Sequence, residues 1–146
     1  MIYLLRHGEA EDGDGDDAAR RLTAKGEAQA RAAGAALAAL EVGLDVCLAS
    51  PRVRAAETAR LTCEPLGIEP ESAAELSGGG FDSLALAAAR GDVLLVGHEP
   101  DLSSEVARLT GAHVKLKKGG LAVVDGSTLL ALLRPNDLAA IADDRG

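Results

Sequence analysis

The 146-residue sequence predicts a single α/β domain, a three-layer α/β/α sandwich with a mainly parallel central sheet. Two observations support this prediction. Short apolar runs typical of buried strands alternate with segments typical of helices, and that alternation favours a parallel sheet covered by helices. No linker or internal repeat interrupts residues 1–146, and a chain of this length can bury a core of its own.

Six segments are predicted to be strands because they are short and mostly apolar and are bounded by turn residues. They span residues 1–6, 45–49, 66–71, 93–96, 120–125 and 127–134. Residues 93–96 are the clearest buried strand, whereas Pro65 and Pro70 favour an edge position for the third strand. The last two strands flank Asp125 and Gly126, a turn pair typical of a β-hairpin.

Helices are predicted between these strands, at residues 24–40, 51–63, 81–90 and 100–109. Thr23 is a suitable N-cap for the first helix, and Gly43 follows its end. Pro51 suits the first turn of the second helix. The remaining segments are predicted loops, including an acidic stretch at 9–17 that glycines interrupt.

Composition and charge exclude several classes of function. Apolar residues make up 47% of the chain, which indicates a globular protein. Tyr3 and Phe81 are the only aromatic residues, so Ala, Leu and Val must fill the core, and stacking on nucleic-acid bases is disfavoured. A net charge of −8 repels nucleic acids and anionic membranes. No apolar run approaches the roughly 20 residues that span a bilayer. From the charge, the few aromatic residues and the absence of such a run, we expect neither nucleic acid nor membrane as a partner.

The N-terminus and the cysteines predict a cytoplasmic protein. Residues 1–6 lack the basic flank and the length of a signal peptide. Cys47 and Cys63, the only cysteines, are therefore expected to be reduced and buried as small apolar residues.

Polar residues follow directly after three of the predicted strands. These segments are residues 6–9 (Arg-His-Gly-Glu), 50–54 (Ser-Pro-Arg-Val-Arg) and 97–99 (Gly-His-Glu). Open parallel sheets bind ligands at the carboxyl ends of their strands, so we expect these residues to meet there. A histidine nucleophile and arginines that pair bidentately with phosphate are what a phosphoryl-transfer site requires.

Two other polar clusters are predicted to be solvated. Asp12, Asp14 and Asp16 alternate as in a calcium-binding loop, but residues 17 and 23 are Asp and Thr where the EF-hand pattern needs Gly and Glu. His113 lies close in sequence to lysines at 115, 117 and 118, where a solvated face is favoured over a ligand or docking site. Arg52 is likewise expected to be a solvated residue.

Four segments of the chain resemble the histidine phosphatase superfamily, also called the phosphoglycerate-mutase-like family. Residues 5–9 (LRHGE) resemble its RHG signature, and residues 22–30 (LTAKGEAQA) its LTxxGxxQA segment. Residues 50–59 (SPRVRAAETA) and 97–100 (GHEP) are similar to its SPxxRAxxTA and GHxP segments. The order is that of the family, and the resemblance covers nearly the whole chain. The short length and residues 96–103 look most like SixA-type phosphohistidine phosphatases.

The resemblance implies a role for each site residue. His7 would be the nucleophile that takes the phosphoryl group, and Arg6 and Arg54 would bind its oxygens. His98 would donate a hydrogen bond to the transferring group. Many relatives add a carboxylate general acid between the second and last segments, and Glu75 is the candidate here.

The sequence thus predicts a phosphatase that forms a covalent phosphohistidine on His7, which water then hydrolyses. No cofactor or metal is expected, because two arginines and His98 supply the positive charge. We expect the substrate to be phosphohistidine on a protein, because only 43 residues separate Arg54 from His98 and leave little chain for a lid. The alternatives are a small-molecule phosphomonoesterase or mutase on the same scaffold, and a phosphoryl-binding module without turnover.

Overall fold

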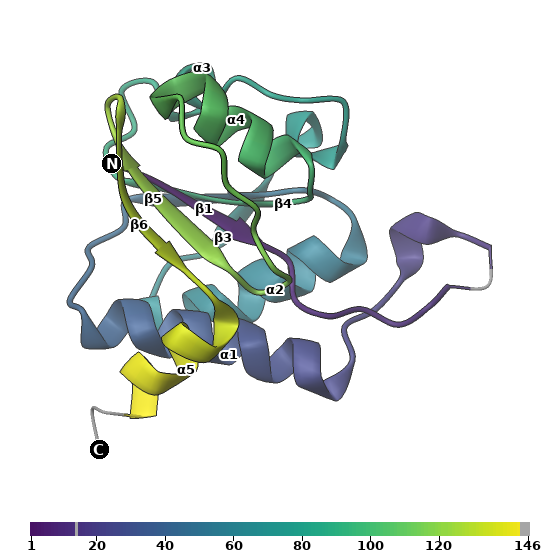
Figure 1. The fold of residues 1–146 in the computed structure, drawn as a ribbon. Helices are drawn as coiled ribbons and strands as arrows, with labels where there is room; N and C mark the ends of the chain where they lie inside the picture. The colour runs from purple at the N-terminus through teal and green to yellow at the C-terminus, as the bar shows by residue number, and fades with distance from the viewer. Residues whose placement is uncertain (14, 144–146) are drawn as a thin grey trace.

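A computed structural model describes residues 1–13 and 15–143, in which six strands form one open sheet (Figure 1). The strands are β1 (Ile2–Arg6), β2 (Val46–Ala49), β3 (Pro70–Ser72), β4 (Val93–Gly97), β5 (Leu121–Asp125) and β6 (Thr128–Leu133). Their order across the sheet is β3-β2-β4-β1-β5-β6. The strands β1 to β4 are parallel, β5 is antiparallel to its neighbour β1, and β6 is antiparallel to β5. This confirms the prediction of a mainly parallel sheet.

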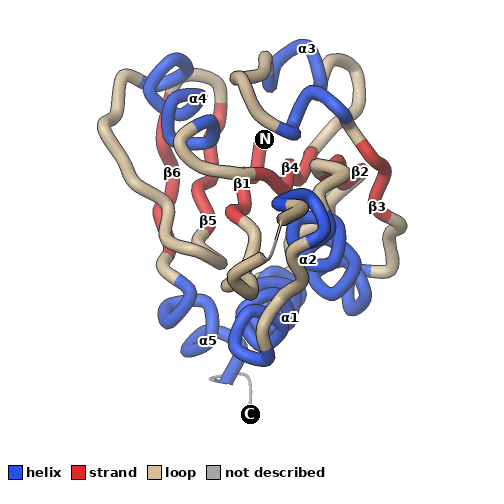
Figure 2. The backbone as a smooth tube through the Cα atoms, turned by 90° about the vertical axis from the view of Figure 1, so that its right-hand side faces the viewer, coloured by secondary structure: helices blue, strands red, loops and turns tan. Residues whose placement is uncertain are grey.

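Helices cover both faces of the sheet, which confirms the three-layer prediction (Figures 1 and 2). The α-helices are α1 (Ala24–Ala39), α2 (Val53–Cys63), α3 (Ser83–Ala87), α4 (Asp101–Thr110) and α5 (Pro135–Asp143). Short 3-10 helices are η1 (Asp17–Ala19), η2 (Glu64–Leu66) and η3 (Ala74–Ser77). One face packs against α1, α2 and α5, and the other against α4 and the segment that contains η3 and α3. None of the described helices is long and apolar enough to cross a bilayer.

The alternating direction of strand side chains divides the core into two layers. On β1, Tyr3 and Leu5 face the α1 side, while Ile2 and Leu4 face α4. Both layers are apolar, as is typical of a parallel sheet that is covered on both faces. Cys47 is buried on the α1 side with a free thiol.

Small residues allow the helices on the α1 side to pack closely, which compensates for the near absence of aromatic side chains. Ala30, Ala33 and Ala36 of α1 are fully buried. A Cβ atom at Gly34 would overlap the carbonyl oxygen of Thr62 in α2. The hydroxyl of Thr62 in turn donates to the carbonyl of Ala30 over 2.9 Å, so a polar contact also joins the two helices.

Two predicted helices begin later than expected. The second starts at Val53 rather than Pro51, because Arg52 is extended and its backbone N–H donates to Ser50 Oγ. The third was predicted over 81–90 but spans only Ser83–Ala87, because the Asp82 side chain caps it and Ala89 has a φ of 59°. The predicted strand 66–71 is likewise shorter, with Pro70–Ser72 at the sheet edge.

The C-terminal helix α5 was not predicted, although the sequence carries a signal for it. Pro135 occupies the first helical position, and the Asp137 side chain accepts a hydrogen bond from the backbone of Arg134, as in one half of a capping box. Leu138 is then fully buried, and Ile141 packs against the same core layer.

Asp14, one of the three alternating aspartates, lies outside the described residues.

Candidate active site

The register of the parallel strands brings His7 and His98 together. Arg6 at the end of β1 pairs with Gly97 at the end of β4. His7 and His98 are the residues that directly follow this pair. The backbone N–H of His7 donates to the carbonyl of Gly97 over 3.1 Å, which extends this pairing by one residue. The centroids of the two imidazole rings lie 5.2 Å apart, with an angle of 55° between the ring planes.

His7 is uncharged and has a defined tautomer. Its Nδ1 lies 2.7 Å from the carbonyl oxygen of Gly8, and since a carbonyl only accepts, Nδ1 carries the hydrogen. Burial lowers the pKa of His7 to about 3; the Gly8 carbonyl opposes this, and the charges of His98, Arg54 and Arg6 add to it. The ring is therefore neutral near pH 7, with a lone pair on Nε2.

The turn after His7 is clamped between α1 and α2. The backbone N–H of Gly8 donates to Thr58 Oγ1 over 3.0 Å, and that hydroxyl donates to the Arg54 carbonyl over 2.7 Å. On the other side, a Cβ atom at Gly26 of α1 would overlap the carbonyl oxygen of Glu9. Thr23 caps α1 as predicted, by accepting from the backbone N–H of Gly26. These contacts fix the backbone that carries His7.

Arg54 lies in the first turn of α2 and is 7% exposed. Both of its terminal nitrogens donate to Asp17. One donates to the backbone oxygen of Asp17 over 2.8 Å, and the other to its carboxylate over 3.2 Å. The Asp17 carboxylate also pairs with Arg52 and with Arg20. Hydrogen bonding by Arg20, together with the charges of Arg54 and Arg52, holds the pKa of Asp17 below its usual value. The loop that projects beyond the carboxyl ends of the strands (Figure 1) thus ties back to α2.

Arg6 is held by the segment that precedes β5. Its guanidinium donates to the carbonyl of Leu116 over 2.9 Å, and the backbone N–H of Leu116 donates to the carboxylate of Glu99 over 3.1 Å. Burial lowers the pKa of Arg6, and the charge of Glu99 opposes that shift. Arg6 remains a cation, because an arginine loses its proton only far above neutral pH.

His98 makes one side-chain hydrogen bond. Its Nε2 lies 2.8 Å from Ser50 Oγ, which already accepts from the backbone N–H of Arg52 over 3.2 Å. When the Ser50 hydroxyl donates to Nε2, Nδ1 carries the ring hydrogen. Burial lowers the pKa of His98 to about 4, and the charges of Arg54 and Arg52 contribute.

Three buried side-chain nitrogens have no hydrogen-bond partner among residues 1–13 and 15–143: Arg6 Nε, Arg54 Nε and His98 Nδ1. The two arginine Nε atoms carry a hydrogen, and all three nitrogens belong to residues that the sequence predicted to bind a phosphoryl group. Leaving a buried donor without an acceptor costs about 1–3 kcal/mol of stability. Unpartnered donors are therefore more typical of a ligand site than of a packed core.

Glu75 differs from the other predicted site residues. It lies on the exposed turn η3, and no hydrogen bond or ion pair joins it to a described residue. The structure thus brings Arg6, His7, Arg54 and His98 together, and Glu75 shares no hydrogen bond or ion pair with them.

Sequence reasoning assigned no role to three residues that hold this site. Ser50 binds His98, Thr58 binds the turn after His7, and Asp17 binds Arg54. Ser50 and Thr58 lie within the motif segment at 50–59, which was the available signal. Asp17 had no such signal, because an acidic loop is solvated by default. The part of the chain that the structure describes holds no group of three His, Cys, Asp or Glu placed to bind a metal ion.

Comparison with known proteins agrees with the resemblance noted in the sequence. A family model of the histidine phosphatase superfamily (branch 1) matches residues 2–83. An uncharacterized protein of Picosynechococcus sp. is 34% identical over 134 residues, which cover 82% of this chain and 81% of that protein.

Solved structures show the same fold. A structure of the protein histidine phosphatase SixA complexed with tungstate has a TM-score of 0.83 and 25% identity, over 94% of this chain and 98% of that chain. A putative phosphohistidine phosphatase SixA from Agrobacterium tumefaciens has a TM-score of 0.81 and 26% identity, over 92% and 97%. A putative alpha-ribazole-5'-P phosphatase from Escherichia coli, at 20% identity and a TM-score of 0.72 over 92% and 96%, shares the fold. The family model, the curated relative and the shared fold together show that this chain belongs to the histidine phosphatase superfamily.

Proposed function

We propose that this protein is a phosphatase that forms a covalent phosphohistidine on His7 and removes phosphate from phosphohistidine on another protein. The observation that carries the proposal is the set of unpartnered buried side-chain nitrogens on Arg6, Arg54 and His98 beside a neutral His7. Their N–H groups match the oxygens of a phosphoryl group, and fixed donors of this kind stabilise developing charge.

In the first step, the lone pair of His7 Nε2 attacks phosphorus in line with the leaving group. A bond forms between Nε2 and phosphorus while the phosphorus–nitrogen bond of the substrate breaks, and its electron pair leaves with the substrate imidazole. The Gly8 carbonyl, which accepts from Nδ1, stabilises the positive charge that develops on the His7 ring. In the second step, a water oxygen attacks phosphorus, the bond to Nε2 breaks, and inorganic phosphate leaves.

Arg6 and Arg54 hold the oxygens of the transferring group, and His98 Nδ1 donates a further hydrogen bond to it. Arg54 is oriented for this role because Asp17 binds its two terminal nitrogens, and Arg6 because the Leu116 carbonyl binds one. Two guanidinium charges supply electrostatic stabilisation that a metal ion supplies elsewhere, so the reaction we propose needs no metal. Chelation with EDTA should leave turnover unchanged, and a loss restored by a divalent ion would contradict this part of the proposal.

The leaving group is the first argument for a phosphohistidine substrate. An alkoxide needs a proton from an enzyme acid, which contributes about 10²–10⁴ in rate. An imidazole leaves with less help, because its pKa of about 6.5 lets it carry its own proton. Glu75, the predicted acid, is exposed and forms no hydrogen bond or ion pair with the site residues, so the site suits a leaving group that needs no acid.

The shape of the site is the second argument. Residues 55–97 are taken up by the rest of α2, by η2, β3, η3, α3 and β4, and by their connections, so no inserted lid lies between Arg54 and His98. His7 and His98 are nevertheless only 6% and 8% exposed, so a substrate must present its phosphoryl group on a narrow arm. A histidine side chain that projects from another protein has this form. The similarity to structures of the protein histidine phosphatase SixA and of a putative phosphohistidine phosphatase SixA supports the same substrate class.

The test compares kcat/KM for a phosphohistidine protein with kcat/KM for small phosphomonoesters such as sugar phosphates. The proposal expects the phosphohistidine protein to be preferred by a wide margin. Preference for a sugar phosphate would favour the small-molecule phosphatase or mutase, and binding without release of phosphate would favour a phosphoryl-binding module. The proposal includes a cytoplasmic location, which cell fractionation tests.

A further inference from the structure

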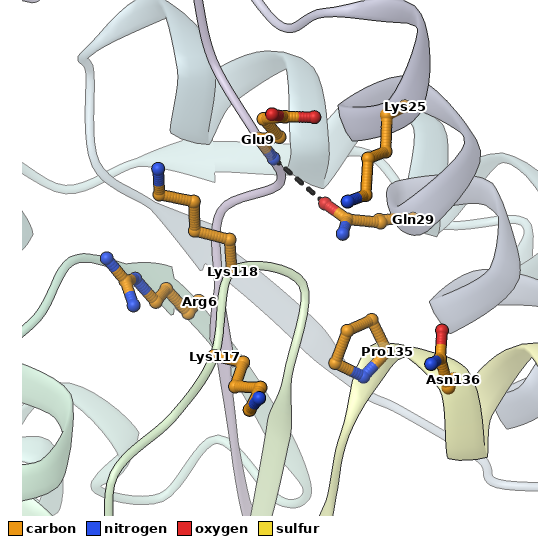
Figure 3. Close-up of a pocket in the computed structure, with 8 residues that line it drawn as sticks. All are labelled: Arg6, Glu9, Lys25, Gln29, Lys117, Lys118, Pro135 and Asn136. Carbon is orange, nitrogen blue, oxygen red and sulfur yellow. Dashed lines mark hydrogen bonds between the residues drawn. The ribbon is translucent and has the colours of Figure 1, made fainter.

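A basic cavity of about 410 Å³ lies beside the candidate active site (Figure 3). Its walls come from the end of β1 and the loop after it, from the start of α1, from the loop before β5 and from the start of α5. The residues that line it are Arg6, Glu9, Lys25, Gln29, Lys117, Lys118, Pro135 and Asn136. Arg6 and Glu9 flank the His7–Gly8 turn, so the cavity adjoins the predicted nucleophile.

The charge of this cavity opposes that of the whole protein. Four of its residues are cations and one is a carboxylate, whereas the chain carries a net charge of −8. The chain has only four lysines, at 25, 115, 117 and 118, and three of them line this cavity. All three side chains are exposed, and none of their ammonium groups forms an ion pair or hydrogen bond with a residue in the described ranges. Glu9 is engaged locally, since its carboxylate accepts from the Thr23 hydroxyl over 3.2 Å.

The backbone fixes the lysines of the loop before β5 relative to His7. The N–H of Gly119 donates to the carbonyls of both Arg6 and His7, over 3.1 and 3.0 Å. Gly119 has a φ of 79°, and a Cβ atom there would come within 2.9 Å of the Gln29 side chain on α1. The loop therefore packs against β1 and α1 at once, which places Lys117 and Lys118 opposite Lys25 across the cavity (Figure 3).

We propose that this cavity binds acidic side chains that flank the phosphohistidine of a protein substrate. Exposed lysines are mobile point charges that attract carboxylates at several positions, rather than the rigid forks that fix one phosphate group. On a chain with net charge −8, a local basic site orients an acidic partner so that its phosphohistidine meets His7, and such complementarity raises the rate of association. This inference rests on the proposed function, because it names the substrate surface that the same site receives.

The experiment uses two chemically phosphorylated phosphohistidine peptides that differ only in their flanks, three glutamates in one and three glutamines in the other. Wild-type protein should hydrolyse the glutamate peptide with a kcat/KM about tenfold higher at low salt, the size expected for a few exposed ion pairs. Added salt should reduce this ratio, because it screens exposed charges. The variant Lys25→Gln/Lys117→Gln/Lys118→Gln should bring the ratio close to one.

Lys115→Gln is the matched control, because Lys115 is exposed on the same segment but does not line the cavity. It should keep the wild-type ratio. Equal kcat/KM for the two peptides with wild-type protein, or a triple variant that keeps the preference, would overturn this inference and leave the proposed function in place. If wild-type protein releases no phosphate from either peptide, the proposed function is overturned and this inference with it.

Discussion

Protonation of His7 and His98 should destabilise the fold as the pH falls from about 7 to about 5. Burial is the main cause that lowers the pKa of His7 to about 3 and that of His98 to about 4. In the unfolded chain a histidine titrates near about 6.5. Between these pH values the unfolded chain binds more protons than the folded chain. Stability is therefore fully present above about pH 6.5 and is lost as the pH falls towards the folded pKa values.

The size of this effect follows from the pKa differences. At about pH 5, an unfolded histidine is about 1.5 pH units below its pKa and is protonated, whereas the same histidine in the folded protein is still mostly neutral. At about 1.4 kcal/mol per unit, each histidine lowers the free energy of unfolding by about 2 kcal/mol, and the pair by about 4 kcal/mol. Total stabilities are roughly 5–15 kcal/mol, so the effect is easily measured. Carboxylates with lowered pKa values, such as Glu105, add little here, because glutamate titrates near about 4.3 when unfolded.

The assay is urea unfolding at the two pH values, for the wild type and for His7→Gln, His98→Gln and the double variant. Each single variant should lose about half of the pH-dependent difference, and the double variant nearly all of it. Equal unfolding free energies for the wild type at both pH values would refute the reasoning, as would a double variant that keeps the full difference.

Two further predictions concern the donors and the packing of the site. Arg6→Ala, Arg54→Ala and His98→Ala should each lower kcat about 10²–10³-fold with the circular dichroism spectrum unchanged, because each removes a donor to the transferring group; near wild-type turnover would remove that residue from the site. Gly26→Ala should lower the free energy of unfolding by about 1–3 kcal/mol and also reduce kcat, because its Cβ overlaps the Glu9 carbonyl behind the His7 turn; an unchanged Tm with unchanged kcat would contradict the account.

The sequence was informative where a local pattern determines a local structure. Residues 93–96 form a buried strand because the run is short and its side chains are branched and apolar. Thr23 caps α1 because its hydroxyl can accept a hydrogen bond from a backbone N–H of the first helical turn. The convergence of Arg6, His7, Arg54 and His98 followed from one rule, that neighbouring parallel strands end at the same edge of a sheet. The pairing of Arg6 with Gly97 follows this rule, because these are the last residues of the neighbouring parallel strands β1 and β4.

The sequence was less informative where tertiary contacts or weak signals decide. The helix α3 ends early because Ala89 adopts a positive φ, which no propensity of alanine predicts. Asp17 binds Arg54 across 37 positions of sequence, and such a contact has no local pattern. The basic cavity is also a product of the fold, since Lys25 and Lys117 are far apart in the chain and line one cavity only after α1 packs beside the loop before β5.

The most direct test of the account is to trap the phosphoryl group on the enzyme. Rapid quenching with labelled phosphohistidine protein should yield a label on the enzyme that is labile in acid and stable in alkali, and mass spectrometry should place it on His7. His7→Ala should carry no label under the same conditions while remaining folded. A label that persists in His7→Ala, or that maps to another residue of the wild type, would contradict the assignment of His7 as the nucleophile.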